Sequence, residues 1–321
     1  MVTIPKTEAE PMRDPKNILV FDVGGSHIAA GVFHTQDMAL TAFKTSPVTN
    51  SASAEDILGT FETLLHGMGV SAGSFAGIGV AMPAPFDYQR GISYMEHKYR
   101  KLYGVSVRNE LARRLGCAPE RVHFLNDATA FLIGELSRGA AIGCDRAVGI
   151  TLGTGVGSAF AVDGKIVTEG AGVPPGGEIW NFPYNGATVE DVVSTRAIQR
   201  FYQQRQGKRE DVKEIARLAA NYAPARGAFE QFGHELGKAL RATCAGFKPD
   251  RVVLGGGIAR SASLFLPAVA SELTGLPFTV RVSDLDHRAP LIGAGMSWAQ
   301  LHGADVAAAT PETTALGAVE A

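Results

Sequence analysis

The sequence contains very few cysteines. Its 321 residues include three, Cys117, Cys144 and Cys244, which lie far apart and form no C-x-x-C pair. Disulfide frameworks and cysteine-rich zinc sites need several closely spaced cysteines, so the sequence predicts neither. A reducing, cytoplasmic setting is the simplest one that fits this cysteine usage.

Long apolar stretches and an excess of one charge are also missing. No window approaches the roughly 18 consecutive apolar residues that a membrane-spanning helix needs. The segment 1–16 contains three prolines and mixed charge without the apolar core of a signal peptide, which predicts a flexible tail. The formal net charge of −2 provides no basic surface for nucleic acid or an acidic membrane. We therefore expect neither kind of partner.

Two common nucleotide-binding fingerprints are absent as well. Glycines at 153–157 follow an apolar run, but the next residues alternate like two short strands around a turn at Asp163-Gly164. A dinucleotide site would need a helix at that point, so a dehydrogenase of this kind is excluded. No G-x-x-x-x-G-K-[ST] element occurs either, since Gly164-Lys165 is followed by Ile166.

Three glycine-rich turns are present, each directly after an apolar run with the character of a strand. Glycine leaves backbone N–H groups accessible to an anion, which is the arrangement that binds phosphate in proteins. Three such turns in one chain therefore favour a phosphate-binding site. The residues concerned are Asp22, Gly24, Gly25, Ser26, Gly153, Thr154, Gly155, Gly157, Gly255, Gly256 and Gly257.

Between the first two turns lies the segment 121–139. Apolar residues over 122–125 predict a buried strand, and apolar residues at every fourth position from Ala128 predict a helix after it. Either Asn126 or Asp127 then begins the helix, where both residue types cap free N–H groups. A capping pair is the simplest interpretation of the two residues taken alone. The neighbouring glycine turns make capping alone a less favoured interpretation.

The order of these motifs resembles that of the ROK (repressor, ORF, kinase) family of sugar kinases, within the actin-like ATPase superfamily: DVGGS, LNDA, TLGTGVGS, GGE and LGGG. The resemblance covers residues 17–302 and implies a two-domain α/β protein with the ribonuclease H-like fold of that superfamily and an active-site cleft between the domains. We expect an N-terminal domain over 17–120, which the C-terminal helix at about 298–310 rejoins. The C-terminal domain is expected over 121–297. Repressor members carry a helix-turn-helix before the kinase-like part, and 1–16 is too short to hold one.

The resemblance also implies roles for these residues. Asp127 is the expected catalytic base, which accepts a proton from a sugar hydroxyl as that hydroxyl attacks the γ-phosphorus of ATP. Asp22 is expected near Mg²⁺ and the terminal phosphates, with an ordinary turn residue as the alternative. The first two turns are expected to hold the phosphates, and the third to pack against the adenosine. The expected sugar-binding residues are Asn126, Asp127, Glu178, Asn181 and Glu190.

The segment 170–190 departs from the family pattern. Relatives carry Gly-Glu-Ile-Gly-His and then a cysteine-rich knot, whose cysteines bind a structural zinc together with that histidine. Here Trp180 and Asn181 stand in place of the Gly and His, and the cysteines are missing. Zinc sites of this kind require thiolate or imidazole ligands, so we expect no structural zinc. The residues expected to fix this loop instead are Phe182, Pro183 and Tyr184.

Three functions are compatible with these residues. The first is ATP-dependent phosphorylation of a glucose-like hexose at its primary hydroxyl, with Mg²⁺, by a homodimer as is usual in the family. The second is a catalytically weakened sugar sensor, and the third is an actin-like ATPase without a sugar substrate, against which Glu178 and Glu190 argue. The sequence leaves open which sugar is used and whether the donor is ATP or polyphosphate. His97 and Lys98 are unassigned, with a solvated loop as the favoured interpretation.

Overall fold

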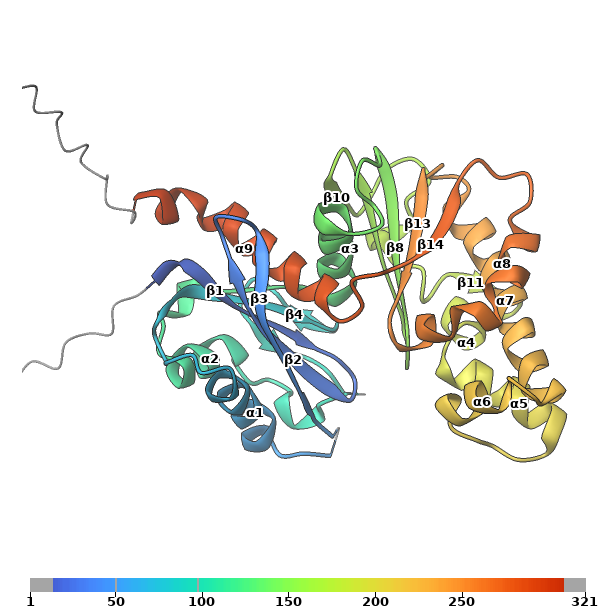
Figure 1. Cartoon of the computed structure of the whole chain (residues 1–321), viewed down its shortest axis with the longest axis horizontal. Coiled ribbons are helices and arrows are strands. Elements are labelled where there is room, and N and C mark those ends of the chain that lie inside the picture. The colour runs from blue at the N-terminus through green and yellow to red at the C-terminus, as the bar shows by residue number, and fades with distance from the viewer. Residues whose placement is uncertain (1–13, 50, 97, 309–321) are drawn as a thin grey trace, which may run out of the picture.

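The structure is a computed structural model that describes residues 14–49, 51–96 and 98–308. Its main strands form two five-stranded sheets, one from each half of the chain, and helices cover both (Figure 1). Each sheet opens with a three-stranded antiparallel meander, and two further strands add in parallel beside the first strand of that meander. The repeated design confirms the predicted α/β fold.

The first sheet extends beyond the limits that the sequence predicts for its domain. Residues 1–13 of the predicted tail lie outside the described residues, and the first strand begins at Asp14. At the other end β7 pairs in parallel with β4, with Asn126 opposite Met82, so the sheet continues past the expected boundary at residue 120. An apolar run alone does not tell which sheet a strand joins. The strands are β1 (Asp14–Val23), β2 (His27–His34), β3 (Ala39–Pro47), β4 (Phe75–Met82) and β7 (Val122–Asn126).

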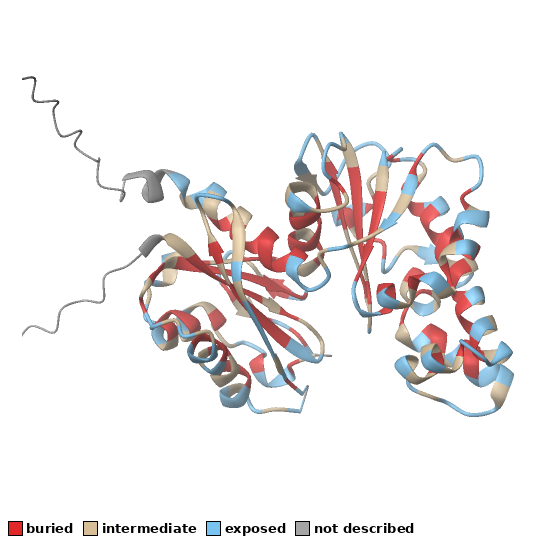
Figure 2. Cartoon of the chain, viewed as in Figure 1, coloured by how far each residue is buried: buried red, intermediate tan, exposed pale blue. Residues whose placement is uncertain are grey.

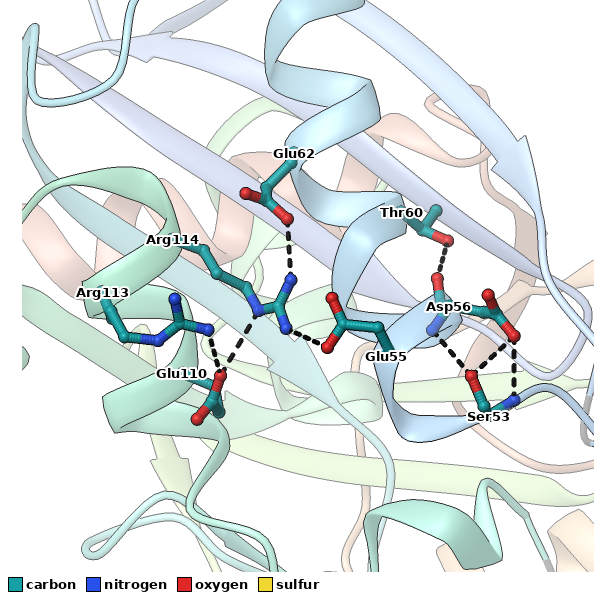
Figure 3. Close-up of polar contacts among 8 residues, drawn as sticks. All are labelled: Ser53, Glu55, Asp56, Thr60, Glu62, Glu110, Arg113 and Arg114. Atoms are coloured by element: carbon teal, nitrogen blue, oxygen red, sulfur yellow. Dashed lines mark hydrogen bonds and ion pairs between the residues drawn. The ribbon is translucent and has the colours of Figure 1, made fainter.

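Two amphipathic helices cover one face of the first sheet. Ser53 caps the first of them, as its position before an apolar repeat predicts. The Arg114 side chain, only 7% exposed, forms ion pairs with Glu55 and Glu62 of the facing helix (Figure 3). Apolar side chains from both helices and the sheet form a continuous core beneath these pairs. The helices are α1 (Ala54–Gly67) and α2 (Val107–Leu115).

The opposite face of the first sheet is covered by α9 (Arg288–Ala308), which also packs against α3 (Asp127–Arg138). Glycines let the two helices approach closely. A methyl group on Gly293 would lie 1.8 Å from the carbonyl oxygen of Ala130, so only glycine fits at this crossing. The fully buried Trp298 continues the contact onto β4, where its ring lies against Gly77, and its indole donates to the carbonyl of Arg121, just before β7, over 2.8 Å.

The second sheet lies between α3 and a group of helices from the second half of the chain (Figure 1). Asp163 and Gly164 both have positive φ, 50° and 73°, which confirms the predicted hairpin. Buried residues fill the sheet and the inner faces of these helices (Figure 2). The strands are β8 (Arg146–Leu152), β9 (Val156–Val162), β10 (Lys165–Val167), β13 (Arg251–Gly255) and β14 (Thr279–Val282). The helices are α5 (Thr195–Gln206), α6 (Val212–Leu218), α7 (Ala223–Cys244) and α8 (Leu266–Glu272).

Helix α3 therefore joins the two halves. It starts at the carboxyl end of β7 in the first sheet, packs on α9, and lies with its other side on β8 and β9 of the second sheet.

None of the helices in the described residues is long and apolar enough to cross a membrane.

Candidate functional site

The junction between β7 and α3 places Asn126 and Asp127 at the centre of the candidate site. Asn126 has an extended backbone, and its Oδ1 accepts hydrogen bonds from the N–H groups of Ala128 and Thr129 at 3.0 and 3.1 Å. The capping interpretation is thus confirmed for Asn126. Asp127 is the first helical residue, and its Oδ1 accepts from the Ala128 N–H at 2.9 Å. Because the cap is made by its neighbour, the Asp127 carboxyl needs another explanation.

A second carboxyl, that of Asp22, lies beside Asp127. Asp22 stands near the end of β1, and burial together with the charge of Asp127 raises its pKa from 3.8 to about 7. Burial also raises the pKa of Asp127, against the opposing effects of the Lys98 charge and the Ala128 N–H. Two carboxyls in a poorly solvated site resist ionising together, because each anion raises the pKa of the other. The pair is therefore suited to hold a proton or to face a cation.

Tyr88 adds a hydroxyl to this group. Its O–H donates to the carbonyl of Met82 over 3.0 Å, and it accepts from Nδ2 of Asn126 over 3.3 Å. Burial is the main cause that raises the pKa of Tyr88. The hydrogen bond from Asn126 acts in the opposite direction, and the charges of Asp127 and Glu178 raise the pKa further. Four side chains from three segments distant in sequence thus converge. Tyr88 is not among the residues that the sequence predicted, because a tyrosine in a turn has many ordinary roles.

Glu178 is held by two neighbours. The hydroxyl of Ser158 on β9 donates to the carbonyl of Gly177 over 2.7 Å and accepts from the N–H of Ile179 over 3.0 Å, so the backbone on both sides of Glu178 is fixed. The indole Nε1 of Trp180 donates to Oε2 of Glu178 over 2.8 Å. Glu178 is half-buried, and Asn181, two residues past Ile179, is exposed.

Glu190 lies against the second glycine turn. Its Oε2 accepts from the N–H of Val156 over 3.1 Å, and its Oε1 accepts from Arg196 over 2.9 Å. A methyl group on Gly155 would lie 2.5 Å from the same Oε2, so glycine at this position makes room for the carboxylate. The structure brings Glu190 to the turn that the sequence assigns to phosphate, whereas Glu178 is the glutamate whose charge reaches Tyr88.

The first two glycine turns come from different sheets and face each other. A methyl group on Gly25 would lie 3.6 Å from Oγ1 of Thr154 and 3.9 Å from Cε of Lys98. The carbonyl of Gly24 accepts a hydrogen bond from the buried Tyr99. The two glycine turns, one from each half, therefore meet close to Asp22 and Asp127.

The third turn, residues 255–257, has glycines for packing reasons in at least two positions. A methyl on Gly255 would lie 2.4 Å from the ring of Phe131 on α3. Gly256 has a positive φ of 84° and would place a methyl 2.4 Å from the carbonyl of Leu152. Around Gly257 there is open space, and this residue begins the 3-10 helix η4 (Gly257–Leu264). The expected contact with adenosine is a prediction for the open side of this turn.

The loop that lacks the cysteines is fixed by a short hairpin, β11 (Pro183–Tyr184) with β12 (Ala187–Thr188). Asn185 and Gly186 form its turn with φ of 49° and 78°, and an Asn-Gly pair is a strong hairpin signal. The Tyr184 hydroxyl donates to Glu235 of α7 over 2.9 Å. Of the residues expected to fix the loop, Phe182 and Tyr184 pack against the core, whereas Pro183 is exposed.

Metal ligands do not gather in this region. Within the residues that the structure describes, no three His, Cys, Asp or Glu side chains are grouped so as to hold a metal ion. The absence of a structural zinc remains a prediction. His97 lies outside the described residues, and Lys98 is half-buried.

The two α/β halves have the same strand order, and a strand-to-turn junction from each half meets at one site. These features define the class of protein, which has the two-domain fold of the actin-like ATPases. A comparison with protein-family models identifies the ROK family over residues 18–300. The chain belongs to that family.

Individual relatives agree with this assignment. The glucokinase of Thermotoga maritima is 29% identical over 270 residues, which cover 76% of this chain and 82% of that protein. The solved ROK hexokinase of Thermus thermophilus is 26% identical, with a TM-score of 0.69 over 90% of this chain and 99% of that one. A ROK family glucokinase from Streptomyces griseus, solved with glucose and AMPPNP, has a TM-score of 0.72 at 21% identity, covers 88% of this chain and 99% of its own, and shows the common fold.

Proposed function

We propose that this ROK sugar kinase transfers the γ-phosphoryl group of ATP to the primary hydroxyl of a glucose-like hexose. The observation that carries the proposal is the position of the Asp127 carboxyl, which lies at the start of α3, beside Asp22 and next to the facing turns of Gly25 and Thr154. A glucokinase and a hexokinase among the relatives support the choice of sugar.

Asp127 acts as the general base in this mechanism. It accepts the proton of the sugar hydroxyl while that oxygen forms a bond to the γ-phosphorus and the bond to the β-phosphate oxygen breaks. Efficient proton transfer requires a base whose pKa is near the working pH, and burial raises the pKa of Asp127 in that direction. The amide of Asn126 is fixed by its capping bonds and by Tyr88, so it can present its remaining N–H to a sugar hydroxyl without losing order.

The site also fits the magnesium ion that ATP-dependent phosphoryl transfer implies. Carboxylate oxygens are preferred Mg²⁺ ligands, and burial together with the charge of Asp127 raises the pKa of Asp22, an effect that a bound cation would oppose. Asp22 is the residue that would hold the ion, directly or through water. When bound, the ion offsets the negative charge of the phosphates.

Glu178 is the principal contact that we propose for the sugar. Its backbone is fixed by Ser158 and its carboxylate is oriented by Trp180, so one oxygen is held while the other can accept from a sugar hydroxyl. We keep Glu190 and the exposed Asn181 as further sugar contacts. In its present position Glu190 also braces the second glycine turn, which would couple the sugar side of the site to the phosphate side.

A coupled kinase assay tests the proposal. Purified protein is supplied with a dozen hexoses and amino sugars, each with ATP or polyphosphate as donor, and the Asp127→Asn variant is measured in parallel. We expect ATP-dependent phosphorylation of a glucose-like sugar that the variant lacks. Sugar binding without turnover under any donor would favour the sensor, and ATP hydrolysis that no sugar stimulates would favour an ATPase.

A further inference from the structure

The loop between β6 (Ile92–Ser93) and α2 runs across the first glycine turn. Two fully buried side chains, Met95 and Tyr99, anchor it in the core of the first sheet. Tyr99 has a left-handed backbone, with φ of 46°, and its hydroxyl donates to the carbonyl of Gly24. A bulky residue at positive φ is an uncommon conformation that the surrounding structure must maintain. The loop is therefore fixed against the turn at the residue that follows Lys98.

The Lys98 side chain extends from this fixed point toward Gly25 in the first glycine turn. It is half-buried, whereas Glu96 and Arg100 on either side of it are exposed. Its Cε would lie 3.9 Å from a methyl placed on Gly25, and Oγ1 of Thr154 would lie 3.6 Å from the same methyl. Lys98 thus reaches the place where the first glycine turn meets the second.

The charges around Lys98 indicate what it does there. Burial raises the pKa of Asp127, and the positive charge of Lys98 acts in the opposite direction, so the ammonium group lies within electrostatic range of that carboxyl. Asp22 and Asp127 would otherwise present two carboxyls to a phosphate group that is itself negative. During transfer the charge on the phosphoryl group spreads over its three equatorial oxygens, and a positioned ammonium stabilises that charge.

We propose that Lys98 is a phosphate-contacting catalytic residue that donates hydrogen bonds to the γ-phosphoryl oxygens during transfer. The inference rests on the proposed kinase function and deepens it. In the step, the sugar oxygen forms its bond to phosphorus, the bond to the β-phosphate oxygen breaks, and Asp127 takes the hydroxyl proton. Lys98 keeps its protons throughout and moves no electrons. Its role is to hold the transferred group between the two turns.

The test compares Lys98→Met with Lys101→Met, a matched control in the same loop whose side chain is exposed. For each variant we would measure kcat, sugar affinity, and the dissociation constants of AMPPNP and of ADP. These two nucleotides differ in the terminal phosphoryl group, so a lysine that contacts this group distinguishes them. ADP binding and the melting temperature also report whether each variant is folded.

We expect Lys98→Met to lower kcat by about 10²-fold. Its affinity for AMPPNP should fall by about tenfold, whereas ADP and sugar affinities change by less than about twofold, because the lost contact is to the γ-phosphoryl alone. Lys101→Met should resemble the unsubstituted protein. Lys98→Arg, which keeps the charge, should bind AMPPNP better than Lys98→Met does, and it serves as the working variant if the methionine variant does not fold.

Equal losses for AMPPNP and ADP, or a kcat above about a tenth of the original in Lys98→Met, would overturn the inference. The binding comparison remains informative without turnover. If the unsubstituted protein phosphorylates no sugar, the proposed function fails. A selective loss of AMPPNP affinity in Lys98→Met would still establish the contact with the terminal phosphoryl group.

Discussion

The indole of Trp180 donates a hydrogen bond of 2.8 Å to the carboxylate of Glu178, two residues away on the segment that departs from the expected family pattern. The indole fixes one carboxylate oxygen and leaves the other accessible. Trp180 itself is 44% exposed, so its ring face is also available beside the site. The residue that breaks the family pattern thus contributes to orienting the glutamate that conforms to it.

Replacing Trp180 by Phe tests this relationship. The ring remains but the N–H donor is lost, and hydrogen bonds to charged groups contribute roughly 1.5–3 kcal/mol. Because the pair is partly exposed, we expect the lower part of that range, or about a tenfold rise in KM for the sugar with a smaller change in kcat. Steady-state kinetics with the preferred sugar provide the measurement. Unchanged sugar kinetics in Trp180→Phe would show that the bond does not position Glu178.

Asp127→Asn should abolish turnover while sparing sugar binding. The amide can still hydrogen-bond the hydroxyl, but it cannot accept the proton, and loss of a general base costs about 10²- to 10⁴-fold. The rate constant and the calorimetric dissociation constant of the sugar are measured on the same preparation. Turnover above about a tenth of the original would remove Asp127 from the role of base.

Gly155→Val should raise the KM for ATP sharply. A side chain here collides with the Glu190 carboxylate, which must then release Val156 or Arg196 and distort the turn. Gly153→Ala is the matched control, because a methyl at Gly153 meets no atom within 4 Å. Sugar affinity without nucleotide is expected to change less than the KM for ATP, because Glu178 and not Glu190 is the principal contact that we propose for the sugar. Equal ATP kinetics in the two variants would contradict this explanation.

The free energy of unfolding of the unliganded protein should depend on pH through the Asp22 carboxyl. Its pKa is about 7 in the folded state and near 3.8 when unfolded, so ionising it costs folding free energy as pH rises between those values. Asp22→Asn removes this cost. Because one pKa unit corresponds to about 1.4 kcal/mol, we expect the stability advantage of the variant over the original protein to be larger at pH 8 than at pH 4 by about 4 kcal/mol. Urea unfolding at both pH values measures the difference, and a gain independent of pH would mean that Asp22 ionises normally.

The protein should contain no structural zinc and should keep its fold and activity in strong chelator once Mg²⁺ is restored. The Asn185-Gly186 hairpin and the bond from Tyr184 to Glu235 fix the loop where the family resemblance would place a metal. Elemental analysis and activity after chelation are the measurements. Stoichiometric zinc that is lost together with activity would overturn this expectation. If the hydrogen bond from Tyr184 to Glu235 fixes the loop in place of a metal, Tyr184→Phe should lower the melting temperature and weaken sugar binding.

The sequence predicts the fold well because periodicity and glycine turns are local signals. The strand before Asn126, its capping role and the hairpin at Asp163-Gly164 all follow from neighbouring residues, and the structure confirms them. Sheet membership is not local: β7 joins the first sheet because of its pairing with β4, which no run of apolar residues encodes.

The candidate site is predictable in part for the same reason. Asp22 and Asp127 belong to motifs, so their types and order point to the chemistry. Tyr88, Lys98 and Trp180 belong to no motif, and their proximity to the site depends on how loops cross between strands. An isolated tyrosine or lysine in a loop is most often solvated, so only the folded chain distinguishes these three from ordinary surface residues.

The crossing of α3 and α9 limits how this enzyme can vary. Gly293 touches the backbone of Ala130, which lies in the first turn of α3 just after Asp127. Any side chain at 293 would push that turn aside and carry the carboxyl with it. A position far along the sequence from Asp127 is therefore constrained by the geometry of the candidate active site. Libraries that aim to alter sugar preference should leave it untouched.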